Sequence, residues 1–192
     1  MNGLAMALAW AANRAYHERN PAEVDRLASD LIELSTRRNF VYWLAIGAIW
    51  RGWARSASGD TKEGISWIER GIRDIRATGT MLYLGWYMAL KAEALHLAAR
   101  TSEALEAINE AEALAETLEQ RDYSAELHRL RGVFLATLGA DETQIEASFA
   151  EAIRIAKEQK SVSAEKCAEA TYAEYQRQKA SASGGRGLRL PL

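Results

Sequence analysis

Apolar residues recur every three to four positions along almost the whole chain, and polar breaks interrupt this pattern about every twenty residues. Such spacing places apolar side chains on one face of a helix, so it predicts an all-α protein. No stretch shows the strict alternation typical of a half-buried strand. The polar breaks delimit nine expected helices, at 2–18, 21–38, 41–57, 61–77, 81–98, 101–118, 122–138, 142–159 and 161–179.

The first eight of these helices group into pairs that repeat every forty residues. Each block ends in an amphipathic helix that runs into polar residues, as in "GIRDIRATGT" (71–80) and "EAIRIAKEQK" (151–160). A fixed internal period of this length predicts an α-solenoid, in which each helix pair packs on its neighbours. We therefore expect one repeat domain over 1–179, with repeats at about 1–40, 41–80, 81–120 and 121–160, a capping helix at 161–179, and a disordered tail at 180–192.

Small residues occupy fixed offsets within these blocks. In the second block, Gly64 follows Gly52 by twelve residues, and Gly71 follows seven residues later. A glycine inside a helix costs about 1 kcal/mol relative to alanine, so these positions predict a close approach of two antiparallel helices. Gly59 and Gly139 precede helix starts and predict left-handed turns. The expected capping residues of the second helices are Asn20, Asp60 and Asp141.

This helix–turn–helix unit resembles the tetratricopeptide repeat. The resemblance is carried by "RGWARSASGDTKEGISWIERGI" and "KAEALHLAARTSEALEAINEAEAL", and the same offsets cover nearly the whole chain. The period of forty residues departs from the family's period of about 34, which implies longer helices. The resemblance implies a superhelix of helix pairs with a concave groove that binds a peptide or protein segment.

A narrower resemblance concerns "RGWARSASGDTKEGISWIERGIRDIRATGT" and the later stretch "AELHRLRGVFL". They are similar to the carboxy-terminal repeat region of large bacterial signalling proteins, in which a nucleotide cyclase or kinase-like domain and an ATPase domain precede the repeats. This resemblance implies that the chain is the repeat portion of such a protein and serves as a regulatory or docking module. The sequence contains no Gly-x-x-x-x-Gly-Lys-Ser/Thr phosphate-binding loop of its own.

One stripe along the first helices is expected to line the groove. Its aromatic residues are flanked by charges, a composition typical of recognition surfaces, and Asn13 offers an amide to an extended peptide backbone. Glu93 and Arg129 lie among apolar neighbours, so each needs a partner or water. Packing between adjacent repeats is the alternative role of this stripe. The candidate partner-binding residues are Asn13, Ile46, Ile49, Trp53, Trp86, Glu93, His96 and Arg129.

Charge and composition narrow the range of partners. The net charge is −2 with 26% charged residues, which gives no indication of a nucleic-acid or anionic-membrane partner. No apolar run approaches the roughly 18 residues of a membrane span, and the first residues lack the positive charges of a signal peptide. We therefore expect a cytoplasmic protein. The single cysteine, Cys167, fits a reducing compartment and is expected to be buried.

Catalysis is not expected from this sequence. Glu93 and His96 have the Glu-x-x-His spacing of di-iron carboxylate proteins, but the sequence lacks a second copy of this motif. His17, His96 and His128 fall in different blocks, without a shared nucleophile. We expect no metal, no cofactor and no enzymatic activity, and the metalloprotein remains a remote alternative.

The leading hypothesis is a scaffold that binds a peptide, a protein segment or another domain of the same polypeptide in its concave groove. The main alternative is a self-association module, in which the apolar ends of the solenoid join two chains as a homodimer. The helical periodicity of the sequence does not identify the partner.

Overall fold

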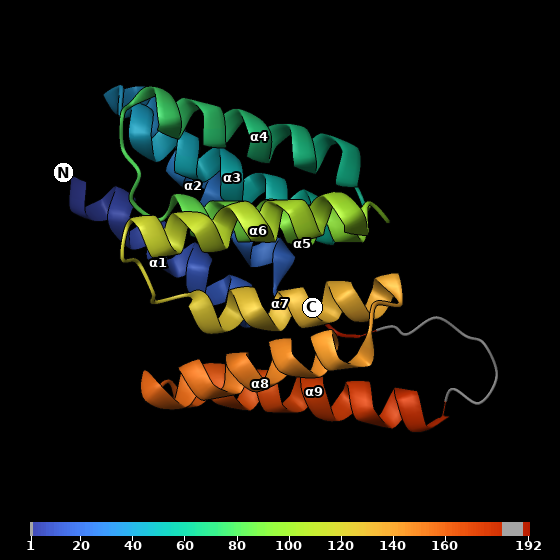
Figure 1. Ribbon diagram of the computed structural model, residues 1–192. Helices are drawn as coiled ribbons and strands as arrows, with labels where there is room; N and C mark the ends of the chain where they lie inside the picture. The colour runs from blue at the N-terminus through green and yellow to red at the C-terminus, as the bar shows by residue number, and fades with distance from the viewer. Residues whose placement is uncertain (1, 182–189) are drawn as a thin grey trace. The chain divides into compact units, whose positions relative to one another are not determined.

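The computed structural model describes residues 2–181 and 190–192, and these residues form nine α-helices and no strands (Figure 1). Most of the tail predicted to be disordered, residues 182–189, lies outside the described residues. The predicted all-α, helical-repeat fold is therefore confirmed. Most helix bounds agree with the sequence to within one or two residues. The helices are α1 (Asn2–His17), α2 (Pro21–Arg38), α3 (Val41–Ala57), α4 (Thr61–Ala77), α5 (Leu84–Leu97), α6 (Thr101–Thr117), α7 (Ser124–Leu138), α8 (Glu142–Glu158) and α9 (Val162–Ser181).

The chain divides into two compact units, residues 1–100 and 101–192. In the first unit, α1 packs on α2 and α3 packs on α4, while α5 lies against both α3 and α4. In the second unit, α7 packs on α6 and α8, and α9 contacts α7 and α8. The division falls between the two helices of the third predicted repeat. Within each unit, helices joined by short connections are neighbours, as expected of antiparallel helix pairs.

The predicted capping residues begin the second helices. The Asn20 side chain accepts a hydrogen bond from the Glu23 backbone N–H at 3.1 Å, and Asp60 accepts one from Glu63 at 3.4 Å. Asp141 caps α8 one residue earlier in the turn, because it accepts from the Thr143 N–H at 2.9 Å. Each such bond satisfies a backbone donor that has no partner within the helix.

Every connection between consecutive helices of the described chain contains a residue in the left-handed region. Gly59 (φ 102°) and Gly139 (φ 68°) confirm the two predicted turns. Most of the others are not glycine, so composition alone did not reveal them. In the connection before α5, both Gly79 and Tyr83 have positive φ, which explains why α5 begins at Leu84 rather than at residue 81. The remaining residues with positive φ are Arg19, Asn39, Ala99, Glu119 and Lys160.

Replacing Ala99 with glycine is expected to raise the free energy of unfolding by about 0.5–1 kcal/mol. The φ of Ala99 is 58°, a conformation that costs a residue with a Cβ roughly 1–2 kcal/mol, and glycine's greater freedom in the unfolded chain offsets part of the gain. Ala99 is exposed, so no packing is lost. Urea unfolding measures the change. Ala98→Gly is the matched control, because Ala98 has a φ of −82°, and it should lower stability.

The close approach predicted from the glycine spacing is present between α3 and α4. A Cβ on Gly52 would lie 2.5 Å from the Gly64 carbonyl oxygen and 2.7 Å from Ile68 Cγ1. A Cβ on Gly64 would in turn meet the Gly52 carbonyl oxygen and the Ser56 hydroxyl. The small positions of all four blocks are buried, namely Ala12, Val24, Leu31, Gly52, Gly64, Gly71, Ala92, Ala104, Ala111, Gly132, Ile145 and Ala152. They set the spacing of the helices.

Candidate binding surface

Seven of the eight predicted groove residues belong to residues 1–100. The residues of this stripe differ in burial. The α3 residues are buried most deeply, since Ile46, Ile49 and Trp53 are at most 2% exposed. Trp86 on α5 is 9% exposed. Asn13 on α1 is half-buried, as is His96 on α5, and His17 at the end of α1 is exposed. The α3 residues thus contribute packing, and we call Asn13, His17, Trp86 and His96 the rim.

Glu93 is the centre of a buried polar cluster. Its side chain is 1% exposed, and it accepts hydrogen bonds from three donors that come from three parts of the first unit. The Tyr16 hydroxyl at the end of α1 donates to Oε1. The Arg19 guanidinium donates to Oε2 at 2.8 Å, and Trp53 Nε1 of α3 donates to the same oxygen at 3.2 Å. The partner that the sequence required for Glu93 is therefore supplied by the protein itself.

The Tyr16 ring joins this polar cluster to an aromatic one. Its centroid lies 4.8 Å from that of Trp53 and 5.4 Å from that of Trp86, both in edge-to-face geometry. The Arg19 guanidinium lies over the Tyr16 ring at 4.9 Å. His17 stacks on Trp86 with centroids 6.0 Å apart and is itself exposed. Such aromatic contacts lock the side chains of the rim in one arrangement.

Sequence reasoning missed Tyr16, His17 and Arg19. The signal was present, because the predicted stripe stops at Asn13 in the first block, and one further helical step of three or four residues reaches Tyr16 and His17. Arg19 carried no such signal, since it lies beyond the end of α1 in a left-handed turn.

His96 lies on the same helix as Glu93, one turn further on. Burial lowers the pKa of its imidazole below the ordinary value, and the nearby Glu93 carboxylate only partly opposes this effect. The ring is therefore mostly neutral at pH 7, and a neutral imidazole carries one donor and one acceptor. Among the described residues, no three His, Cys, Asp or Glu side chains gather where they could hold a metal ion.

Arg129, the eighth predicted residue, lies in the second unit and is 1% exposed. From α7 it donates to both carboxylate oxygens of Glu126 at 2.7 Å, and to the Thr171 hydroxyl of α9 at 3.3 Å. It also donates to the carbonyl oxygen of Pro191 at 3.4 Å. The sequence predicted that Arg129 needs a partner. In the structure its partners are the Glu126 carboxylate on the same helix, the Thr171 hydroxyl and the Pro191 carbonyl group.

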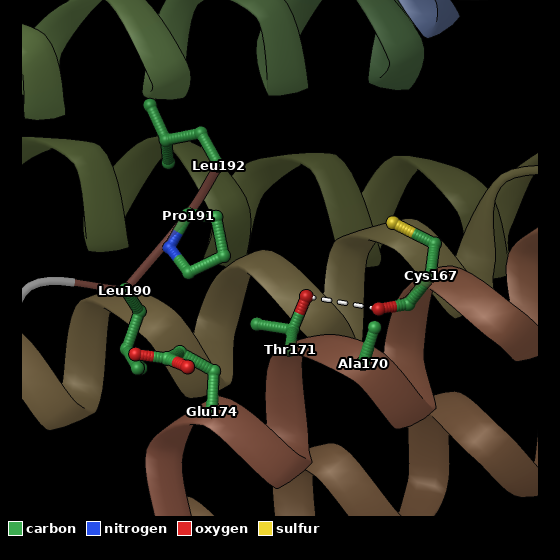
Figure 2. A pocket seen from close by; sticks show the side chains of 7 residues that line it. All are labelled: Cys167, Ala170, Thr171, Glu174, Leu190, Pro191 and Leu192. Atoms are coloured by element: carbon green, nitrogen blue, oxygen red, sulfur yellow. Dashed lines mark hydrogen bonds between the residues drawn. The ribbon is translucent and has the colours of Figure 1, made fainter. Parts of the chain in front are cut away.

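Two groups that this arginine contacts, Thr171 and Pro191, line a pocket of about 650 Å³ (Figure 2). Side chains of α9 form one wall, and Leu190, Pro191 and Leu192 form the other. Cys167 belongs to the α9 wall and is exposed, so the prediction that it is buried was wrong. The physical reason is its position on α9, where Ala168, Thr171 and Tyr175 face the interior instead.

These features define a tetratricopeptide-like helical-repeat protein. No family model matches the chain. In structure it is similar to Bacillus thuringiensis PlcR, solved in complex with the peptide PapR7 and DNA, with a TM-score of 0.62 and 14% sequence identity over 94% of this chain and 74% of that one. This likeness concerns the fold. None of the described helices is sufficiently long and apolar for a membrane span.

In sequence the chain is similar to the uncharacterized protein R02095 of Rhizobium meliloti (strain 1021). The two are 29% identical over 111 residues, which are 58% of this chain. The matched region spans only 11% of that relative's length.

Proposed function

We propose that this chain is a non-catalytic module that binds a peptide or protein segment along the rim formed by Asn13, His17, Trp86 and His96. The observation that carries this proposal is the Glu93 cluster beneath the rim. It holds Tyr16 and Trp53 by hydrogen bonds, and Tyr16 in turn contacts Trp86. A recognition surface gains affinity when its side chains are ordered before the partner arrives.

The chemistry of the rim suits an extended peptide. Asn13 carries both an amide donor and an acceptor, which match the N–H and C=O groups of a peptide backbone. The exposed His17 ring, which stacks on Trp86, supplies a flat contact surface. PlcR, which shares the fold, was solved with a bound peptide, and this supports the same class of ligand here.

The biological context is also part of the proposal. A regulatory role within a longer bacterial signalling protein accords with the Rhizobium meliloti relative, of which the match covers only 11%. In that setting the bound segment belongs to another domain of the same polypeptide or to a separate protein. The net charge of −2 argues against a nucleic-acid partner for this chain, although PlcR was solved with DNA.

We expect the double variant Asn13→Ala/His17→Ala to bind its partner roughly five- to 150-fold more weakly than the parent chain, because each of the two lost contacts removes on the order of 0.5–1.5 kcal/mol. Both side chains are at least partly exposed, so the fold should survive. Affinity capture from cell lysate identifies the partner, and calorimetry with the purified partner measures the change in Kd.

The matched control is Glu33→Ala/Arg37→Ala, which removes an exposed ion pair from α2. It should leave Kd unchanged. Equal Kd values for the parent and the rim variant would disprove the assignment of the rim. If the bait retrieves no partner and is dimeric in light scattering, self-association is favoured instead. The exposed Met6 and Trp10, which lie one turn apart on α1, provide apolar surface for it.

A further inference from the structure

The last three residues of the chain lie against the second unit. The Leu190 side chain is 8% exposed, Leu192 is half-buried, and Pro191 between them is exposed. The three residues line the pocket opposite Cys167, Ala170, Thr171 and Glu174 of α9 (Figure 2). Burial is therefore greatest at Leu190 and least at Pro191.

A main-chain contact fixes this segment in place. Arg129 Nη1 donates to the Pro191 carbonyl oxygen, while its other nitrogens are held by Glu126. The arginine is 1% exposed, and the Thr171 hydroxyl also accepts from Nη1. The donor that meets the segment is thus oriented by the fold and buried from water. A hydrogen bond to a carbonyl group recognises an extended backbone of any sequence, and the apolar wall selects the side chains.

The chemistry of the wall favours one class of peptide. Ala170 and Cys167 give the α9 wall apolar surface, and the Glu174 carboxylate on the same wall is paired with Arg177. Proline restricts the backbone to an extended form and has no N–H that would need a partner. An extended segment with leucines on either side of a proline fits these features.

We propose that the surface between α7 and α9 is a peptide-binding site, which Leu190–Leu192 occupy within the chain and which accepts a peptide of the same chemistry from outside. The inference rests on the proposed function in that it treats the chain as a peptide-binding module. It adds a second site to this module and names the class of peptide that the site binds. The internal segment then acts as a competitor of external peptides. Its tether gives it an effective concentration in the millimolar range.

The first test measures whether the segment is bound in solution. A spin label is attached to the full chain at Lys166→Cys, since Lys166 is exposed and does not line the pocket. The background is Cys167→Ala, which keeps an apolar side chain in the α9 wall. We expect the NMR amide signals of Leu190 and Leu192 to lose most of their intensity, and to regain it when Leu190→Ser is added. Val162→Ser, an exposed change on the same helix, should not restore them. Full intensity in the parent chain would overturn the proposal.

The second test measures binding from outside. A fluorescent peptide of sequence GRGLRLPL, which corresponds to residues 185–192, is titrated into the parent chain and into the full chain with Leu190→Ser/Leu192→Ser. We expect the variant to bind the peptide roughly fivefold more tightly, because its own competitor is weakened. Adding Arg129→Lys, which keeps the charge and loses the forked donor, should weaken that binding. Equal affinities for the parent and the variant, or no binding to either, would overturn the proposal.

The experiments test the assignments of the two sites separately. If the rim variant Asn13→Ala/His17→Ala loses its partner while GRGLRLPL binds neither chain, the proposed function stands and this inference is wrong. If GRGLRLPL binds as expected and the rim variant keeps its partner, the rim assignment is wrong and the second site stands.

Discussion

Replacing Gly52 with alanine is expected to lower the free energy of unfolding of residues 1–100 by about 3 kcal/mol. The added methyl group would lie 2.5 Å from the Gly64 carbonyl oxygen and 2.9 Å from the Ile68 backbone nitrogen. Both atoms belong to the backbone of α4, so no side-chain rotation relieves the contact, and the two helices must separate. Overpacking of this kind costs about 1–3 kcal/mol or more, which exceeds the gain of about 1 kcal/mol in helix propensity.

Urea unfolding followed by tryptophan fluorescence measures this effect, because all six tryptophans lie within residues 1–100. Gly3→Ala is the matched control. Gly3 is also helical, but an added Cβ there meets nothing within 4 Å. The free energy of unfolding of the Gly3→Ala variant should therefore be unchanged or slightly higher than that of the parent. If Gly52→Ala unfolded at the same urea concentration as the parent, the contact between α3 and α4 would not be as close as the structure indicates.

The success of the sequence-based fold prediction has the same physical origin. Glycine inside a helix is unfavourable, so its recurrence at Gly52, Gly64 and Gly71 required a compensating contact, and only helix pairs at close range provide one. Apolar periodicity then gave the helix bounds. The errors occurred where the local backbone depends on tertiary structure: Tyr83 adopts a left-handed conformation that its side chain does not favour, and this delays the start of α5.

The site was less predictable, because a residue's partner depends on the fold. The pattern showed that Glu93 and Arg129 needed partners, and the structure provides them. Tyr16 and Arg19, however, are separated from Glu93 by 77 and 74 residues, and no local pattern links them. Cys167 was misassigned for a related reason, since the composition of α9 does not show which of its faces meets α8. Periodicity defines the faces of a helix, but the partners of each face come from the tertiary structure.

Replacing Glu93 with alanine is expected to lower the free energy of unfolding by about 2–4 kcal/mol, because each buried donor left without an acceptor costs about 1–3 kcal/mol. The change leaves the Tyr16 hydroxyl and Trp53 Nε1, both on buried side chains, without their common acceptor, and it leaves Arg19 without its counter-ion. Glu93→Gln should cost about 2 kcal/mol, because the amide keeps one acceptor oxygen but turns an N–H₂ group toward a donor. Urea unfolding monitored by tryptophan fluorescence measures both.

Glu33→Gln is the matched control, since Glu33 forms an exposed ion pair with Arg37 on α2, and such pairs contribute less than about 1 kcal/mol. A double-mutant cycle of Tyr16→Phe with Glu93→Gln then isolates the contribution of the hydroxyl. We expect a coupling of at least about 1 kcal/mol, because the two groups are buried and in direct contact. A coupling near zero would mean that Glu93 does not join α1 to α5 through Tyr16. The rim would then lack its support, and its ordered arrangement would need another source.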